Sequence, residues 1–276
     1  MQSTHLEKTR PGRKRGEWGR CYTAPPSRCW GYAITSAAAA NSLAPSVARW
    51  RAVQARLRAA EQRFGREAGS VGLVAVTKTQ SVARIRQLAA LGQRAFGENY
   101  LQEARPKLDA CAGLGLEWHF IGTVQSNKAA EVARRFDWVH TVASPQQARR
   151  LAQARPAERA PLNVCLQVNA DDAPGKAGVA PHDAAQLAAL VASLPALRLR
   201  GLMTVPARED AFDTQREPFR VLRRLLDDLR EQGFDLDTLS MGMSGDLEAA
   251  VAEGATLVRI GTALFGPRRP KHHNDN

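Results

Sequence analysis

Short apolar runs alternate with longer amphipathic segments between about residues 46 and 268, and this alternation is the strongest constraint on the fold. The run at 72–76, Gly-Leu-Val-Ala-Val, is continuously apolar, as expected for a parallel strand buried on both faces. Further strand-like runs follow at a regular spacing, and a helical segment separates each from the next. They lie near residues 93–96, 117–121, 137–141, 162–169, 198–203, 238–240 and 257–260.

Strands that alternate with helices predict a parallel sheet, and about eight such units predict an α/β protein of the (β/α)8 TIM barrel type. The alternative is an open, doubly wound sheet, which would need a G-x-G-x-x-G turn after its first strand. Here the first strand runs instead into Thr77-Lys-Thr-Gln80. Helices are expected near residues 47–60, 81–91, 102–110, 128–136, 145–155, 182–193, 219–232 and 247–253.

Residues 1–45 differ from the rest of the chain, because they are rich in Arg, Pro, Ser and Gly and follow no helical or strand period. Residues 1–46 hold seven basic and two acidic side chains, which is +5 of the total charge of +12. Three interpretations stay open: a disordered basic extension, a targeting peptide, or a wrongly assigned start. We favour the first or the third, because residues 31–43 are too polar for a signal-peptide core. The barrel is assigned to 46–268 and a polar tail to 269–276.

The composition argues against several classes of protein. No apolar run reaches the roughly 18 residues that span a membrane. The four cysteines form no C-x-x-C pair, which argues against a disulfide scaffold and a structural zinc site. The basic side chains are mostly arginines scattered along helices, without interleaved aromatics, which argues against nucleic-acid binding. Binding of nucleic acid by residues 1–46 is kept as an alternative, and we expect a cytoplasmic protein.

Lys78 closes the first predicted strand, and in a TIM barrel the chemistry lies at the C-terminal strand ends. Partial desolvation there favours the neutral amine, which is the nucleophile that forms a Schiff base with an aldehyde or ketone. Taken alone, such a lysine is more often a rim residue whose amine reaches solvent. The lysine therefore needs support from elsewhere in the sequence.

That support comes from the last two predicted strands. Ser244-Gly245 precedes one helix and Gly261-Thr262 precedes a short turn, so both pairs present N–H groups and a hydroxyl suited to phosphate. TIM barrels often bind phosphate after strands seven and eight, although each glycine could equally serve a tight turn. A Schiff-base lysine with a phosphate cradle describes pyridoxal 5′-phosphate. Arg259 would point towards its ring, or would form a salt bridge inside the barrel.

Six ordered sequence blocks resemble the pyridoxal phosphate homeostasis proteins, the YggS/PROSC-type family, over residues 46–268. They also resemble the N-terminal barrel of alanine racemase. Because all six occur in order, the resemblance is more specific than any single motif. The blocks are Val76-Thr-Lys-Thr79, Phe96-Gly-Glu-Asn-Tyr100, Trp118-His-Phe-Ile-Gly122 with Gln125-Ser-Asn-Lys128, Gly201-Leu-Met203, Ser240-Met-Gly-Met-Ser244, and Val258-Arg-Ile-Gly-Thr262 with Phe265-Gly266.

The resemblance implies a fold-type III pyridoxal-phosphate barrel in which Lys78 holds the cofactor as a Schiff base. It also implies that Arg259 faces the pyridine nitrogen. By the same resemblance the phosphate ligands are Ser244, Gly261 and Thr262, and Asn99 and His119 line the pocket near the ring. The sequence departs from the family at Gly245, at Thr123-Val124 and at residues 173–175, away from Lys78 and Arg259.

The function that the resemblance implies is intracellular pyridoxal phosphate (vitamin B6) homeostasis without robust catalytic turnover. Apo-enzymes that accept the cofactor are the expected partners, and the expected assembly is a monomer or weak dimer. The alternative is a pyridoxal-phosphate-dependent amino-acid racemase or lyase. A racemase needs a base on each face of its substrate, and alanine racemases take the second, a tyrosine, from a C-terminal domain. This sequence ends at Asn276 and its tyrosines are Tyr22, Tyr32 and Tyr100, which disfavours a racemase.

Overall fold

The computed structural model describes residues 37–171 and 175–266. The chain divides into two units, Met1–Ala40 and Asn41–Asn276, and the second contains the sheet and all the residues discussed below. The expected basic extension lies outside the described residues as far as residue 36. The expected polar tail lies outside them entirely.

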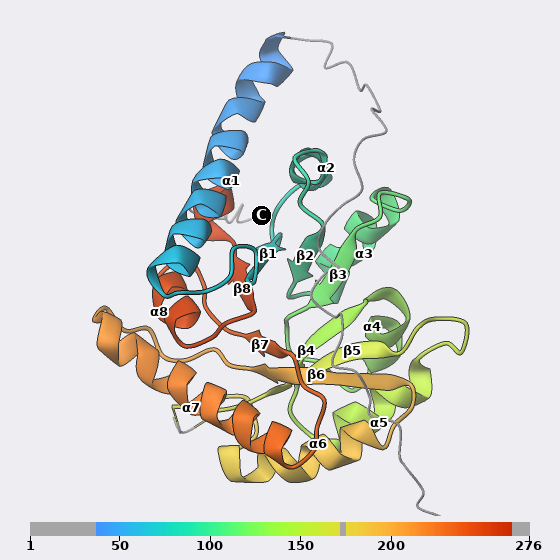
Figure 1. The fold of residues 1–276 in the computed structure, drawn as a ribbon. Helices are drawn as coiled ribbons and strands as arrows, with labels where there is room; N and C mark the ends of the chain where they lie inside the picture. The colour runs from blue at the N-terminus through green and yellow to red at the C-terminus, as the bar shows by residue number, and fades with distance from the viewer. Residues whose placement is uncertain (1–36, 172–174, 267–276) are drawn as a thin grey trace, which may run out of the picture. The chain divides into compact units, whose positions relative to one another are not determined.

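Eight parallel strands form a closed barrel in chain order, so the predicted (β/α)8 TIM barrel is confirmed (Figure 1). Closure occurs where β1 pairs with β8, with Gly72 opposite Leu257 and Ala75 opposite Ile260. Each strand begins and ends within two residues of its predicted bounds. The strands are β1 (Gly72–Val76), β2 (Ala95–Glu98), β3 (Glu117–Phe120), β4 (Trp138–Val142), β5 (Leu162–Gln167), β6 (Leu197–Met203), β7 (Thr238–Ser240) and β8 (Leu257–Ile260).

Amphipathic helices follow the strands and bury one apolar face each against the barrel. In α7, Phe219, Leu222, Leu226 and Leu229 recur at helical spacing and are buried. The helices are α1 (Ala37–Arg63), α2 (Val82–Ala90), α3 (Leu101–Ala110), α4 (Ala129–Arg135), α5 (Pro145–Ala154), the 3-10 turn η1 (Pro181–Asp183), α6 (Ala184–Ala192), α7 (Phe212–Glu231), α8 (Leu247–Ala252) and α9 (Thr262–Phe265).

Two helix boundaries differ from the prediction. The first helix begins at Ala37, so residues 37–45, which we assigned to the extension, are helical. Alanine has the highest helix propensity and can lengthen an existing helix without any amphipathic pattern. The helix α7 begins at Phe212, seven residues before its expected start at 219, and contains Pro218. Its first turn is held by Phe212, whose ring stacks on that of Phe64 with centroids 6.0 Å apart.

Within the described residues, no helix has the length and apolar character needed to cross a membrane. The same part of the chain holds no group of three or more His, Cys, Asp or Glu side chains arranged to bind a metal ion. Its two cysteines, Cys111 and Cys165, are free thiols buried in the protein.

Candidate functional site

Lys78 is half-buried and lies two residues beyond the end of β1, at the mouth of the barrel. The next residue, Thr79, has a φ of 65°, which is unusual for a β-branched side chain. The Thr79 N–H donates a 2.8 Å hydrogen bond to Glu103 Oε2 on α3. A carboxylate from the neighbouring helix therefore holds the turn that presents Lys78.

A buried ion pair lies directly beside this turn. Lys107 Nζ is 2.8 Å from Glu98 Oε1 and donates a second 2.8 Å bond to the main-chain oxygen of Thr77. The Thr77 hydroxyl donates to the same Glu98 oxygen. Burial raises the pKa of Glu98, and the hydrogen bonds from Lys107 and Thr77 offset only part of that rise. The pair fixes the backbone one residue before Lys78.

The loops after β7 and β8 meet, as the predicted cradle requires. The Ser244 hydroxyl accepts a 3.3 Å hydrogen bond from the N–H of Ala263 in α9. Gly242, which starts the first loop, has a φ of 94°, and a Cβ there would lie 2.5 Å from Ala250 Cβ. The loop can therefore turn this tightly only with glycine. Ser244, Gly261 and Thr262 are thus brought together at the start of α8 and α9.

Arg259 lies inside the barrel, with only 4% of its surface exposed. Its Nη1 donates to Ser240 Oγ at 2.7 Å and its Nη2 donates to the Thr204 main-chain oxygen at 2.8 Å. Burial lowers the pKa of Arg259 to about 10, so the guanidinium remains charged at neutral pH. Among the described residues no carboxylate pairs with it, which argues against the alternative of a salt bridge inside the barrel.

Asn99 and His119 lie at different depths. The Asn99 side-chain oxygen is buried and has no hydrogen-bond partner among the described residues. His119 is inside the barrel, 1% exposed, where its ring stacks on Trp138 with centroids 5.4 Å apart. Its Nδ1 is 2.9 Å from Nε2 of His140. His119 therefore lies beneath the mouth, whereas Asn99 faces into it.

A cavity of about 300 Å³ opens at the mouth beside β2 to β6. Of the seven predicted site residues, Asn99 lines it, whereas the lysine and the cradle come from β1, β7 and β8 on the other part of the rim. The cavity wall is mostly amide and hydroxyl in character, with one lysine and one tyrosine. It includes Tyr100, Gln125, Lys128, Thr141, Gln167 and Met203.

Several residues that build the site were not predicted as site residues. Glu98, Thr204 and Ser240 stand at strand ends, so their positions were a usable signal. His140 stands inside the buried strand β4, where a fully buried histidine needs a partner. Lys107 and Glu103 lie on a helix, and only the folded structure brings them to Lys78.

Comparison with known proteins defines the class of this barrel. Residues 49–269 match the family model "Alanine racemase, N-terminal domain". The solved alanine racemase of Corynebacterium glutamicum matches 79% of this chain and 62% of its own, with a TM-score of 0.61 and 20% identity. At that identity the likeness concerns the fold alone. The chain is therefore a barrel of the alanine racemase N-terminal class.

Closer relatives narrow the class. The pyridoxal phosphate homeostasis protein of Pseudomonas aeruginosa is 52% identical over 228 residues, covering 83% of this chain and 96% of the relative. That of Escherichia coli K12 is 46% identical over 231 residues, covering 83% and 97%. PipY of Synechococcus elongatus, solved with PLP bound, is 39% identical with a TM-score of 0.67, covering 76% and 98%. The chain belongs to the pyridoxal phosphate homeostasis protein family.

Proposed function

We propose that this protein binds pyridoxal 5′-phosphate reversibly through Lys78 and takes part in the intracellular homeostasis of that cofactor. The carrying observation is the convergence at one barrel mouth of Lys78, the Ser244 and Thr262 loops, and the buried Arg259. The relative PipY, with PLP bound, supports the assignment. The names of the curated relatives support the role in homeostasis.

The residues present fit the chemistry of this cofactor. Lys78 supplies an amine, and the loop N–H groups and hydroxyls of Ser244, Gly261 and Thr262 supply phosphate donors. Bound pyridoxal phosphate supplies an aldehyde that condenses with amines and a ring that withdraws electrons. Asn99 lines the cavity, and its buried side-chain oxygen has no hydrogen-bond partner among the described residues, so it has acceptor capacity for a bound group.

Arg259 supports a carrier rather than an efficient catalyst. Its guanidinium only donates hydrogen bonds, and it retains its proton at neutral pH. Opposite a pyridine nitrogen, such a donor occupies the lone pair without transferring a proton. The ring then withdraws electrons less strongly, which slows chemistry at an attached amino acid. We therefore propose that turnover is negligible, and that apo-enzymes in the cytoplasm are the eventual acceptors. A monomer or weak dimer stays the predicted assembly.

The rival function, a racemase or lyase, has a specific place in this structure. Tyr100 and Lys128 are titratable side chains that line the cavity, and either could act as a second proton donor. Alanine racemisation by the protein, lost on Tyr100→Phe or Lys128→Met, would establish the enzyme. We expect no D-alanine above the background of free pyridoxal phosphate.

The test of the carrier is a visible absorbance spectrum before and after borohydride, followed by peptide mapping. The protein loaded with pyridoxal phosphate should be yellow, and reduction should fix the cofactor to Lys78. Lys78→Ala should lose the absorbance band while keeping some non-covalent binding, because each charge-assisted phosphate contact is worth about 1.5–3 kcal/mol. Lys128→Met, a second lysine at the same mouth, is the matched control and should keep the band. A reduced adduct on another lysine would overturn the assignment of Lys78.

A further inference from the structure

A buried chain of hydrogen bonds crosses the interior of the barrel from β8 to β3. It begins with Arg259 Nη1, which donates to Ser240 Oγ at 2.7 Å. Ser240 Oγ is also 2.7 Å from His140 Nδ1, and His140 Nε2 is 2.9 Å from His119 Nδ1. All four side chains are at most 4% exposed. The chain links the arginine of the proposed site to two histidines that the proposed function leaves without a defined task.

The first link fixes the direction of the next. An arginine can only donate, so the Ser240 oxygen accepts from Arg259. The Ser240 hydroxyl hydrogen then needs an acceptor, and among the described residues its remaining neighbour is His140 Nδ1. His140 therefore accepts at Nδ1. A neutral imidazole that accepts at one nitrogen carries its hydrogen on the other, so His140 donates from Nε2 to His119 Nδ1.

The far end of the chain favours the same direction. Once His119 accepts at Nδ1, its hydrogen is on Nε2, which makes no hydrogen bond among the described residues but lies 3.5 Å from Glu117 Oε2. In the reverse direction an unprotonated His119 nitrogen would face that carboxylate. Burial raises the pKa of Glu117, but the nearby His119 ring and the hydrogen bond from Trp138 more than offset it and lower the pKa, so the carboxylate is charged at neutral pH. Both ends of the chain therefore specify one set of tautomers.

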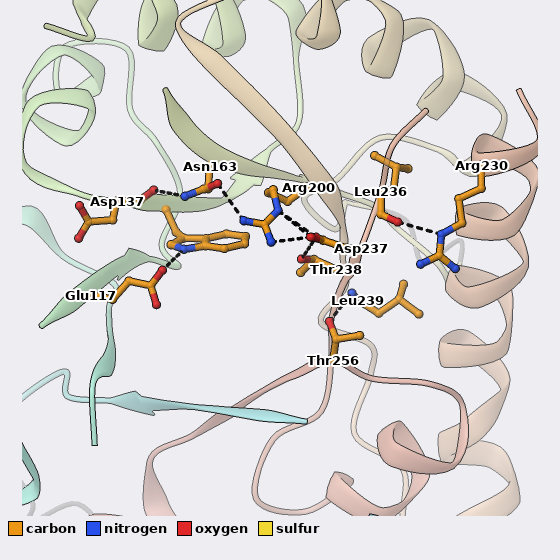
Figure 2. Close-up of polar contacts among 11 residues, drawn as sticks. Glu117, Asp137, Asn163, Arg200, Arg230, Leu236, Asp237, Thr238, Leu239 and Thr256 are labelled. Atoms are coloured by element: carbon orange, nitrogen blue, oxygen red, sulfur yellow. Dashed lines mark hydrogen bonds and ion pairs between the residues drawn. The ribbon is translucent and has the colours of Figure 1, made fainter. Parts of the chain in front are cut away.

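Other side chains hold Glu117, at the β3 end of the chain of hydrogen bonds, in place. Glu117 and Trp138 open β3 and β4, and the indole nitrogen of Trp138 donates to the Glu117 carboxylate (Figure 2). Arg200 packs over the Trp138 ring at 4.7 Å and is bound by Asp237 and Asn163. Figure 2 shows the Arg200 guanidinium between Asn163 and Asp237, with dashed lines to both. The polar chain thus ends in a fixed network rather than in free solvent.

We propose that His140 is a positioning residue, which as the neutral Nε2–H tautomer accepts the Ser240 hydroxyl and so turns the Ser240 oxygen towards the Arg259 guanidinium. Protonated His140 could no longer accept, and its charge would lie close to Arg259. Burial, together with the charge of Arg259, lowers the pKa of His140 well below that of a free histidine, in keeping with a neutral ring. The consequence for the cofactor rests on the proposed function, whereas the tautomer does not.

The first test is independent of any cofactor. In two-bond ¹H–¹⁵N spectra of the apo-protein at pH 7, His140 should show Nε2 protonated and Nδ1 unprotonated, and so should His119. The protein has six histidines, and the His140 signals are identified as those that disappear in His140→Asn. A hydrogen on Nδ1 of His140, or a doubly protonated ring, would overturn the proposal.

The second test asks whether His140 acts through Ser240 on Arg259. An asparagine oxygen can replace Nδ1 as an acceptor, whereas leucine cannot, so His140→Asn should bind pyridoxal phosphate within about threefold of wild type. His140→Leu should bind about tenfold more weakly, the equivalent of one hydrogen bond to a charged group. Ser240→Ala is a smaller change that should give the same loss, which keeps the test valid if His140→Leu fails to fold.

The outcomes separate this proposal from the proposed function. Circular dichroism should first show that wild type and Ser240→Ala are both folded. Equal affinity of the two proteins for pyridoxal phosphate would then show that the chain of hydrogen bonds does not position Arg259. Equal losses in His140→Asn and His140→Leu would reduce His140 to a packing residue and overturn the positioning role. If wild type binds no pyridoxal phosphate, the proposed function fails, and the tautomer spectrum still decides the direction of the chain.

Discussion

Arg56 on α1 donates a 2.7 Å hydrogen bond to the main-chain oxygen of Ser244, the residue whose hydroxyl reaches the start of α9. Its Nε is also 2.6 Å from the carboxylate of Glu248, in the first turn of α8. Arg56 therefore ties the first helix of the chain to the loop that forms the proposed phosphate cradle.

Arg56→Met should weaken pyridoxal phosphate binding by about three- to tenfold, because the Ser244 carbonyl loses its charged donor. The free energy of unfolding should fall by about 1 kcal/mol, since both partners are about a third exposed and solvent screens the pair. Titration followed by absorbance, together with urea unfolding, measures the two effects. The matched control is Arg51→Met, an exposed arginine on the same helix, which should leave both unchanged.

The stability effect of Arg56 should depend on pH. The hydrogen bond from Arg56 is the main cause of a lowered pKa of Glu248. A carboxylate with a lowered pKa in the folded state stabilises the protein above its unfolded pKa of about 4.3, and this stabilisation is lost as the pH falls. The difference in unfolding free energy between wild type and Arg56→Met should therefore shrink between pH 6 and pH 3. A difference that stays constant would show that the ion pair contributes nothing.

The buried pair of Glu98 and Lys107 predicts a large and asymmetric effect. Lys107→Met leaves a buried carboxylate without its cation and should cost about 3–5 kcal/mol, measured by urea unfolding at pH 7. The double variant Glu98→Gln with Lys107→Met removes the stranded charge and should recover most of that loss. A double variant as unstable as Lys107→Met would show that packing, rather than charge, dominates.

The loss of stability in Lys107→Met should also shrink as the pH falls, although the carboxylate involved has a raised rather than a lowered pKa. Burial raises the pKa of Glu98 in the folded protein, and removal of the lysine raises it further. The folded state then takes up the proton more readily than the unfolded state, so stability rises as the pH falls towards 4.3. The free energy of unfolding that Lys107→Met loses at pH 7 should therefore be partly recovered at pH 5. Urea unfolding of the variant and of wild type at both pH values measures this recovery.

The barrel could be predicted from the sequence because strands such as β1 and β8 are short runs that are rich in apolar residues and largely buried. Such a run can be recognised from a few consecutive residues, and the strand at 72–76 was predicted with the bounds that the structure shows. Strand ends then placed Lys78, Arg259 and the two loops on one rim by topology alone. Residues 37–45 escaped prediction because an alanine-rich helix end carries no hydrophobic period.

The supports of the site could not be predicted in the same way. Arg56 and Ser244 are 188 positions apart, and His140 and Ser240 are 100 apart, so no local pattern connects them. Arg259 illustrates the limit. Its two interpretations, ring contact or internal salt bridge, differ only in whether a carboxylate faces it, and that depends on side chains from other strands.

The cradle predicts a graded series of binding losses. A Cβ on Gly261 would lie 3.4 Å from Val76, an ordinary contact, so Gly261→Val should fold while its side chain fills the proposed phosphate space. It should weaken cofactor binding more than Ser244→Ala, which removes one hydroxyl. Ser193→Ala is the control, because it removes an exposed hydroxyl at the end of α6, away from the cradle. Equal affinity of wild type and Gly261→Val for pyridoxal phosphate would show that the phosphate binds at another site.

Removal of residues 1–36 or 1–45 should leave the melting temperature unchanged within a few degrees. The buried side chains of α1 that belong to the core, Val53, Leu57 and Ala60, remain in both forms. The helix loses only a stretch that precedes Ser46. Differential scanning calorimetry of the two truncations and the full chain makes the comparison. A drop of about 10 °C for either would show that the removed segment packs on the barrel.

Thr79 carries the last prediction, because its left-handed backbone directly follows Lys78. A β-branched residue is strained at a φ of 65°, whereas asparagine adopts this region more readily. Thr79→Asn should therefore raise the free energy of unfolding by about 0.5–1 kcal/mol. The N–H bond to Glu103 involves the main chain and should survive, so borohydride should still fix the cofactor to Lys78. Thr123→Asn, at another exposed loop position but without a positive φ, should change stability little. If Thr79→Asn is instead destabilising, the threonine side chain itself supports the turn, and the strain is not stored in the backbone.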